Sequence, residues 1–194
     1  MNETGRVEAF SDGVFAIAIT LLILEIKVPA ASENLGTALL HDWPSFLAFL
    51  TSFFTIGVMW MNHHRLFTLI EGANDTLIAL NLLLLLGITW VPFPTALLAE
   101  HLSERIAAVV YAATFFVISV VFQLLWSYAT RTRGIIPPDK EEHAAHITKQ
   151  YRWGPLFYVV AILFAIFSGT ACLIWSLLLA IYFALPPRIV ARRA

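Results

Sequence analysis

Residues 6–28 read RVEAFSDGVFAIAITLLILEIKV, a short apolar centre with ionisable residues at both ends. The uninterrupted apolar part, residues 13–24, is shorter than the about 20 residues that a helix needs to cross a bilayer. A helix over the whole stretch is long enough, but it carries Arg6, Glu8 and Asp12 to membrane depth. Because a charge facing lipid is costly, we expect this helix to face protein or water.

The composition of the whole chain is that of a membrane protein. Hydrophobic residues make up 59% and charged residues 13% of the 194 residues, and the mean hydropathy is +0.79. Soluble domains contain roughly half apolar and a quarter charged residues. The formal net charge of −1 provides no basic surface for nucleic acid. We therefore predict an all-α integral membrane protein with one domain, residues 1–194.

Four further apolar stretches follow the first helix. Residues 43–61, 77–98 and 106–126 are each long enough for one span, and Pro92 and Pro94 are expected to kink the second of these. The run 156–185 corresponds to about 45 Å of helix, which is long for one span and short for two. Ser168 and Gly169 near its centre favour a helical hairpin, which gives six transmembrane helices.

The distribution of lysine and arginine supports six helices over five. With the N-terminus in the cytoplasm, only Lys27 and Arg105 lie outside. Five helices would move Arg188, Arg192 and Arg193 outside as well, against the positive-inside rule. Both termini are therefore predicted to be cytoplasmic, with ten basic residues on that side: Arg6, Arg65, Arg131, Arg133, Lys140, Lys149, Arg152, Arg188, Arg192 and Arg193.

Two features lie outside the spans. The loop 131–152 is the one sizeable polar stretch, and its segment 139–151, after two prolines, is predicted to form a short interfacial helix. The chain has no internal repeat, so symmetry around a pore would have to come from several copies of it.

One side of the first helix is an apolar stripe. At 100° per residue the stripe contains Phe10, Gly13, Ile17, Thr20, Leu21, Leu24 and Val28. If this stripe faces lipid or the protein core, it is ordinary packing. If it faces a symmetry axis, several copies of Ile17, Leu21 and Leu24 form stacked apolar rings, and such a constriction can gate a pore by dewetting.

The polar side of the first helix needs partners. Ser11 and Asp12 point away from the stripe, and His63, His64 and Asn81 lie on the same side of the membrane by the charge count. We expect these side chains to form a hydrogen-bonded network that clamps three helices. The alternative is a direct role in proton or ion transfer, because histidine titrates near neutral pH.

Arg6, Phe10, Ser11 and Asp12 spell R-x-x-x-F-S-D, which resembles the signature of the lysosomal potassium channel family typified by transmembrane protein 175. The continuation GVFAIAIT, residues 13–20, is similar to the prokaryotic members of that family. The resemblance covers the whole chain in outline: one six-helix unit, histidines at the end of the second helix and a terminal hairpin.

The resemblance implies a potassium-preferring channel, in which the first helices of a homotetramer line the pore. It further implies that Ile17, Leu21 and Leu24, with Thr20 between them, form the constriction. In the family, residues matching Arg6, Phe10, Ser11 and Asp12 hold the helices together near the cytoplasm. A T-V-G-Y-G element is absent from the sequence, so a ring of backbone carbonyls is not expected to select the ion.

Other functions are weaker predictions. His63 and His64 are adjacent on a helix and diverge by about 100°, so they cannot share one metal, and we expect neither a metal nor a cofactor apart from the permeant potassium ion. No nucleophile–base set lies within the spans, so we do not expect an enzyme. The alternative is a proton-coupled carrier, or a proton-conducting channel, that uses Asp12 and a histidine. The expected location is the inner membrane of a prokaryote.

Overall fold

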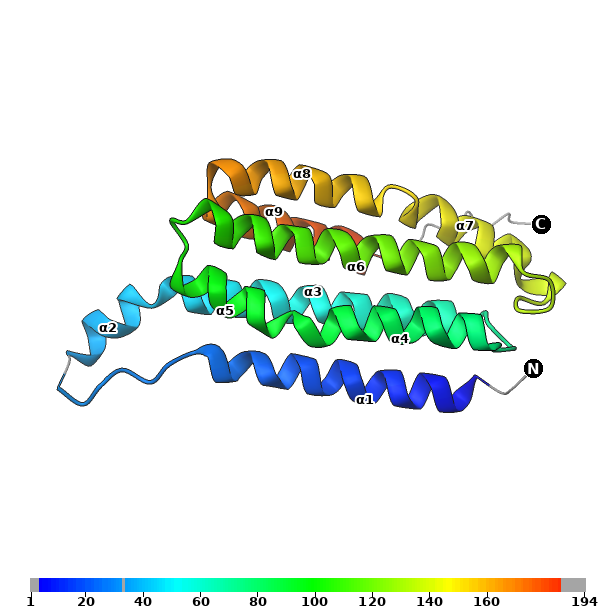
Figure 1. Cartoon of the computed structure of the whole chain (residues 1–194), viewed down its shortest axis with the longest axis horizontal. Coiled ribbons are helices and arrows are strands. Elements are labelled where there is room, and N and C mark those ends of the chain that lie inside the picture. Colours follow the sequence, from blue (N-terminus) through cyan, green and yellow to red (C-terminus); the bar gives the residue numbers. More distant parts are fainter. Residues whose placement is uncertain (1–3, 33, 186–194) are drawn as a thin grey trace.

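The computed structural model describes residues 4–32 and 34–185, and this part of the chain is helical without strands. The helices lie side by side as an elongated bundle (Figure 1). Their bounds are α1 Gly5–Leu21, η1 Leu22–Glu25, α2 Leu35–His41, α3 Trp43–Phe67, α4 Asp75–Trp90, α5 Pro92–Glu100, α6 Arg105–Arg131, η2 Pro138–Lys140, α7 Glu141–Tyr151, α8 Gly154–Phe167 and α9 Gly169–Ala184.

Within the described residues, 5 helical segments are long and apolar enough to cross a membrane. They are Gly5–Glu25, Trp43–Phe67, Asp75–Glu100, Arg105–Arg131 and Pro138–Phe167, and α9 is a shorter apolar helix of 16 residues. Successive segments alternate in direction along the bundle, and α9 returns beside α8 (Figure 1). The apolar helices agree with the predicted class of multi-pass membrane protein.

The predicted hairpin at Ser168 and Gly169 is confirmed. Ser168 is extended, with φ −161° and ψ 127°, and its hydroxyl accepts a hydrogen bond from the Ala171 amide at 3.3 Å. Gly169 lies so close to the preceding α5–α6 turn that an added Cβ would be 2.5 Å from the Leu102 carbonyl oxygen. A short N-cap residue followed by glycine therefore lets α8 and α9 fold back on each other at this point.

The prolines of the third apolar stretch divide it into α4 and α5. Proline has no N–H and its ring clashes with the preceding turn, so α4 cannot continue across Pro92. Pro92 and Pro94 lie instead in the first turn of α5, where a missing N–H leaves no bond within α5 unmade. The Thr95 hydroxyl donates to the Val91 carbonyl at 2.8 Å, and the Thr95 amide donates to the same carbonyl at 3.2 Å. The Ser52 hydroxyl lies 2.8 Å from that of Thr95, which ties α5 to α3.

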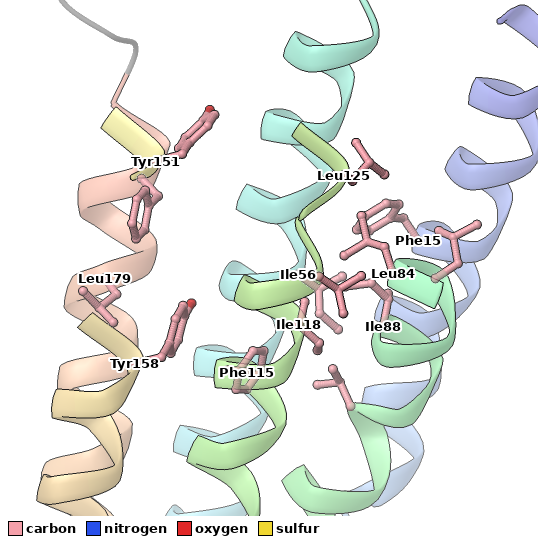
Figure 2. Close-up of a cluster of buried hydrophobic side chains, with 14 of the residues drawn as sticks. Phe15, Ile56, Leu84, Ile88, Phe115, Ile118, Leu125, Tyr151, Tyr158 and Leu179 are labelled. Atoms are coloured by element: carbon pink, nitrogen blue, oxygen red, sulfur yellow. The ribbon is translucent and has the colours of Figure 1, made fainter. Parts of the chain in front are cut away.

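The buried core runs between the helices of the bundle, and Figure 2 shows part of it, with side chains from α1, α3, α4, α6, α8 and α9. Tyr111 and Phe115 of α6 are fully buried, and the Phe115 ring stacks on Tyr158 of α8 with the ring centres 6.0 Å apart. Ile56 of α3 and Leu84 of α4 fill the other side of α6. In a membrane such aromatic packing stabilises the bundle through close contact rather than through release of water.

Two sequence predictions on elements, and one helix that was not predicted, can be compared with the structure. The first helix was expected to reach Val28, but this was wrong: the 3₁₀ turn ends at Glu25, and Ile26 is extended with φ −85° and ψ 110°. The helix α2 was not predicted, because its seven residues carry no long apolar run. The short helix after Pro137 was predicted and is present as η2 and α7.

The described basic residues gather at one end of the bundle. Lys27 and Arg105 lie at the end where α2 is, and the other described lysines and arginines lie at the end where α1 begins (Figure 1). Arg188, Arg192 and Arg193 lie outside the described residues. The end of the bundle where α1 begins thus carries more basic residues than the other end, as the sequence predicts.

Candidate functional site

The helix α1 has two different faces. Ser11, Phe15, Ala18 and Leu22 are buried against the rest of the bundle, at spacings of four, three and four residues. This is the periodicity of a helix that packs along one side only. The other face is therefore left without a partner inside the single chain.

That second face is the apolar stripe of the sequence analysis. All members of the stripe are exposed in the single chain: Phe10, Gly13, Ile17, Thr20, Leu21, Leu24 and Val28. The exposed fraction is 61% for Ile17, 42% for Leu21 and 72% for Leu24. The Thr20 hydroxyl donates to the Ile17 carbonyl at 2.9 Å, so it is satisfied within its own helix. The structure thus places the four predicted constriction residues on one free surface.

Behind this face, a buried chain of hydrogen bonds joins α1, α3 and α4. The Asn81 amide nitrogen donates to the Ser11 hydroxyl at 2.9 Å, and the Ser11 hydroxyl donates to the Val7 carbonyl at 2.7 Å. Nε2 of His63 lies 2.9 Å from the Asn81 amide oxygen. Since that oxygen can only accept, Nε2 of His63 carries a proton and donates it. These contacts bring together Ser11, Asn81 and one of the two predicted histidines.

The His63 ring is held by aromatic neighbours as well. Phe67 of the same helix stacks on it with ring centres 4.3 Å apart, and Phe15 of α1 lies 5.4 Å away. The other ring nitrogen, Nδ1, has no hydrogen-bond partner among the described residues. His63 therefore acts here as a hydrogen-bond donor that packs α1 against α3.

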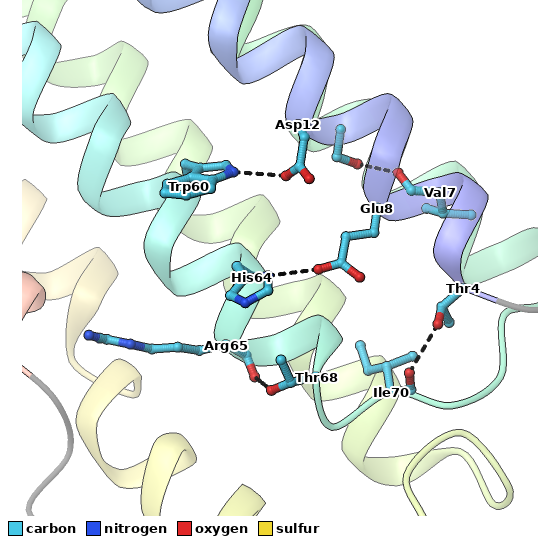
Figure 3. Close-up of polar contacts among 10 residues, drawn as sticks. Thr4, Val7, Glu8, Asp12, Trp60, His64, Arg65, Thr68 and Ile70 are labelled. Atoms are coloured by element: carbon cyan, nitrogen blue, oxygen red, sulfur yellow. Dashed lines mark hydrogen bonds and ion pairs between the residues drawn. The ribbon is translucent and has the colours of Figure 1, made fainter.

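Asp12 is not part of this chain of hydrogen bonds. Its carboxylate accepts a hydrogen bond from Nε1 of Trp60 at 2.8 Å (Figure 3). His64 is also separate, with Nδ1 2.7 Å from the Glu8 carboxylate. The expectation of one network containing Ser11, Asp12 and a histidine is therefore corrected. There is a buried chain of hydrogen bonds, and beside it a more exposed rim that consists of Glu8, Asp12, Trp60 and His64. The physical reason is the helix itself, because adjacent residues diverge by about 100°.

The rim contacts follow a spacing that the sequence analysis missed. Glu8 and Asp12 are four residues apart on α1, and Trp60 and His64 are four residues apart on α3, so the two pairs face each other (Figure 3). Residues at i and i+4 lie on the same side of a helix. Glu8 was not predicted as a partner, and this spacing was the signal that could have identified it.

Arg6 and Phe10 are not brought into either set of contacts within one chain. Arg6 is exposed and forms no ion pair with the described residues, and Phe10 is 58% exposed. Both lie on the same helix as Ser11 and Asp12, at the end of the bundle that carries most of the positive charge. The residues of the R-x-x-x-F-S-D motif therefore divide into a pair that binds within the chain and a pair that points away.

At the opposite end of the bundle, an ion pair holds the segment after α1 against α5. The Lys27 ammonium donates to the Glu100 carboxylate, and this interaction raises the pKa of Lys27 above its ordinary value. The pair is exposed to solvent, so screening by water keeps its contribution to stability small. Glu100 is thus a partner of Lys27 rather than a free solvated charge.

Comparison with known proteins identifies the family. The model of the endosomal/lysosomal potassium channel TMEM175 family matches residues 6–92, which include α1, α3, α4 and the whole hydrogen-bonded cluster. A potassium channel of Chamaesiphon minutus is 50% identical over 192 residues, with 95% of both chains covered. The chain belongs to the TMEM175 family. A second relative, a potassium channel of Streptomyces collinus, is 45% identical over 190 residues that cover 94% of this chain and 92% of the relative.

The folds of TMEM175 proteins agree with this assignment. The crystal structure of a lysosomal potassium-selective channel TMEM175 homolog from Chamaesiphon minutus superimposes with a TM-score of 0.85 over 93% of this chain and 96% of that one. The endosomal/lysosomal proton channel TMEM175 of Homo sapiens is 36% identical over 138 residues. Those residues cover 64% of this chain but 27% of the human protein, which is much longer.

Proposed function

We propose that this chain is a potassium-preferring cation channel that conducts passively. The observation that carries the proposal is the exposed apolar face of α1, which holds Ile17, Thr20, Leu21 and Leu24 together and has no partner inside one chain. The relatives that match nearly the whole chain are potassium channels, which supports the same function. The expected partners are potassium ions, the lipid bilayer and further copies of the chain.

The pore would be built by four chains with their α1 helices around a common axis. Six segments of each chain cross the membrane in this arrangement: α1, α3, α4 with α5, α6, α8 and α9. Copies of Ile17, Leu21 and Leu24 then form apolar rings, and a narrow apolar ring resists wetting unless it widens. Thr20 adds one hydroxyl per chain between these rings.

Arg6 and Phe10 would stabilise the tetramer near the cytoplasmic end of the pore. Both are exposed in the single chain, whereas Ser11 and Asp12 of the same motif already have partners on α4 and α3. The motif therefore offers one pair of side chains for packing within the chain and one pair for contacts between chains. His63, His64 and Asn81 would keep α1 at a fixed angle to the pore axis.

The orientation follows from the charges. Most described basic residues lie at the end of the bundle where α1 begins, so this end and both termini are proposed to lie in the cytoplasm, with the chain in the inner membrane of a prokaryote. Since the relatives are channels, we propose no enzymatic activity and no resident cofactor or metal.

Proton conduction is the second candidate. The vertebrate relatives are proton channels, and they match 64–66% of this chain. The His64–Glu8 pair places an imidazole beside a carboxylate at the proposed cytoplasmic end of α1. A proton-coupled carrier would use the same groups, but it would also need a transported substrate. Its transport rate would saturate as the concentration of that substrate rises.

The test is ion flux in liposomes that contain the purified protein and potassium. A proton-sensitive dye and a proton ionophore report potassium efflux, and sodium-loaded liposomes give the comparison. Rapid potassium flux with weaker sodium flux supports the channel. In a second arm, valinomycin carries the potassium and the proton ionophore is left out. A dye signal equal to that of the first arm would then establish proton conduction through the protein. Flux that needs a co-substrate and saturates would replace the channel with a carrier.

A further inference from the structure

A groove of about 970 Å³ opens at the end of the bundle where α1 begins, away from the exposed face of α1. It lies between the end of α6, the loop that follows it and α7. Its lining holds more polar surface than the grooves between the spans do. The groove takes no part in the hydrogen-bonded cluster described above, so its function has to be sought separately.

The groove carries more positive than negative charge. Arg131, Arg133 and Lys149 line it, all three are exposed, and none of them forms an ion pair with the described residues. The carboxylates that face them are Glu71 and Glu141. Glu71 is already bound by the Lys140 ammonium at 2.9 Å. Among the described lining residues, Glu141 is thus the one carboxylate without an ion pair, and three cations line the same groove.

The walls of the groove are held in place. The Glu71 amide donates to the Ile135 carbonyl at 3.0 Å, and Ile135 is fully buried. Gly134 has φ 81°, a conformation that glycine adopts without strain, so the turn after Arg133 is closed by a residue suited to it. On the α7 side, Thr148 accepts a hydrogen bond from Nε1 of Trp126 at 2.9 Å. The cations are therefore presented on a preformed surface.

We propose that this groove binds a phosphate group through Arg131, Arg133 and Lys149. Guanidinium groups bind phosphate oxygens through paired hydrogen bonds, and an ammonium adds a compact charge. The groove also lies at the level of lipid headgroups. The 27 residues of α6 span about 40 Å, which exceeds the roughly 30 Å hydrocarbon core, so Arg131 emerges from it. A phospholipid headgroup is the nearest source of phosphate, and free phosphate in the cytoplasm is the other.

The test measures binding of dioctanoyl phosphatidylglycerol to the full-length protein in detergent by calorimetry. The double variant Arg131→Gln/Arg133→Gln is expected to bind it about tenfold more weakly or worse, because each basic residue at an anionic site contributes several-fold in affinity. The matched control is Arg152→Gln. Arg152 lies at the same end of the bundle and stacks on Trp153, with its guanidinium 4.7 Å from the ring centre, but it does not line the groove.

Further arms separate the sources of phosphate. Dioctanoylglycerol has the same tails without phosphate and is expected not to bind. Inorganic phosphate that binds wild type and not the double variant would identify a soluble phosphate as the ligand, and failure of inorganic phosphate with retained lipid binding would identify the headgroup. Equal lipid affinity of wild type and double variant would overturn the proposal, as would equal loss in the control variant. The outcome is independent of ion conduction.

Discussion

His63 shows how a single buried side chain fixes the arrangement of three helices. Its Nε2 donates to Asn81, whose amide in turn donates to Ser11, so the orientation of each group is determined by the next. Asn81 is 1% exposed and supplies both a donor and an acceptor to this chain. Because it faces two helices at once, its loss leaves the His63 N–H without its acceptor and removes the donor to the Ser11 hydroxyl, which still donates to Val7.

Replacement of Asn81 by leucine is predicted to destabilise the protein by about 1–3 kcal/mol, the usual cost of leaving a buried donor unsatisfied. The size and shape of the side chain are nearly kept, so the effect comes from the lost hydrogen bonds. The measurement is thermal unfolding in detergent, with Thr89→Val as control, since the exposed Thr89 hydroxyl bonds only within its own helix. Equal unfolding temperatures of the two variants would show that the chain of hydrogen bonds contributes nothing.

At this scale, sequence reasoning identified the side chains better than their partners. A helical wheel correctly separated Ser11 and Asp12 from the apolar stripe, and the type of each residue predicted polar contacts with α3 and α4. It could not decide which histidine meets which group, because that depends on the rotation of α3. In the structure, His63 forms a hydrogen bond with Asn81, and His64 forms one with Glu8.

Among the elements, the hairpin of α8 and α9 depends on a close approach of two backbone segments. Gly169 begins α9 against the turn between α5 and α6, and a Cβ there would lie 2.5 Å from the Leu102 oxygen. A backbone atom cannot rotate away as a side chain can, so the two segments would have to separate. The glycine is therefore required by packing and not by its backbone angles.

The substitution Gly169→Ala is predicted to destabilise the protein by about 1–3 kcal/mol through overpacking. The control is Gly57→Ala in the middle of α3, where an added Cβ meets nothing within 4 Å. That change is expected to be neutral or to stabilise the helix by about 0.5–1 kcal/mol, because alanine loses less backbone entropy than glycine. A lower unfolding temperature for Gly57→Ala than for Gly169→Ala would refute this account of the hairpin.

The elements themselves were largely predictable. Long apolar runs gave α3, α4 with α5, and α6, and the prolines placed the break within the third run. The helix α2 and the early end of the first helix were missed. The former is only 7 residues long, and the latter depends on the extended conformation of Ile26. Pro29, three residues after Ile26, was the signal that could have predicted this early end.

For the whole molecule, one chain is incomplete as a pore. Ser11 and Asp12 of α1 have hydrogen-bond partners within the bundle, but the opposite apolar face is open along its length. In the proposed tetramer, four copies with these faces turned inward would cover the face and enclose an axis. The number of copies cannot be read from one chain, because residue patterns show which surface is free and not how many surfaces meet.

The purified protein is therefore predicted to be a tetramer, with four times the 21.7 kDa mass of one chain after correction for detergent. Light scattering coupled to size-exclusion chromatography measures this mass. Phe10→Asp, on the exposed α1 face, is expected to shift the mass towards the monomer, whereas Leu163→Asn on the exposed side of α8 leaves it unchanged. A wild-type monomer or dimer would contradict the proposed pore.

The most direct test of the central claim, that α1 lines the conducting path, is block by silver ions of single cysteines in planar bilayers. Silver is small enough to follow potassium and binds thiolates tightly. The one native cysteine, Cys172, is buried, so wild type provides a quiet background. The account predicts that silver rapidly and persistently blocks potassium current through Ile17→Cys, while Leu163→Cys on α8 and wild type keep theirs. Unchanged current through Ile17→Cys would contradict it, because the exposed face of α1 would then lie outside the pore.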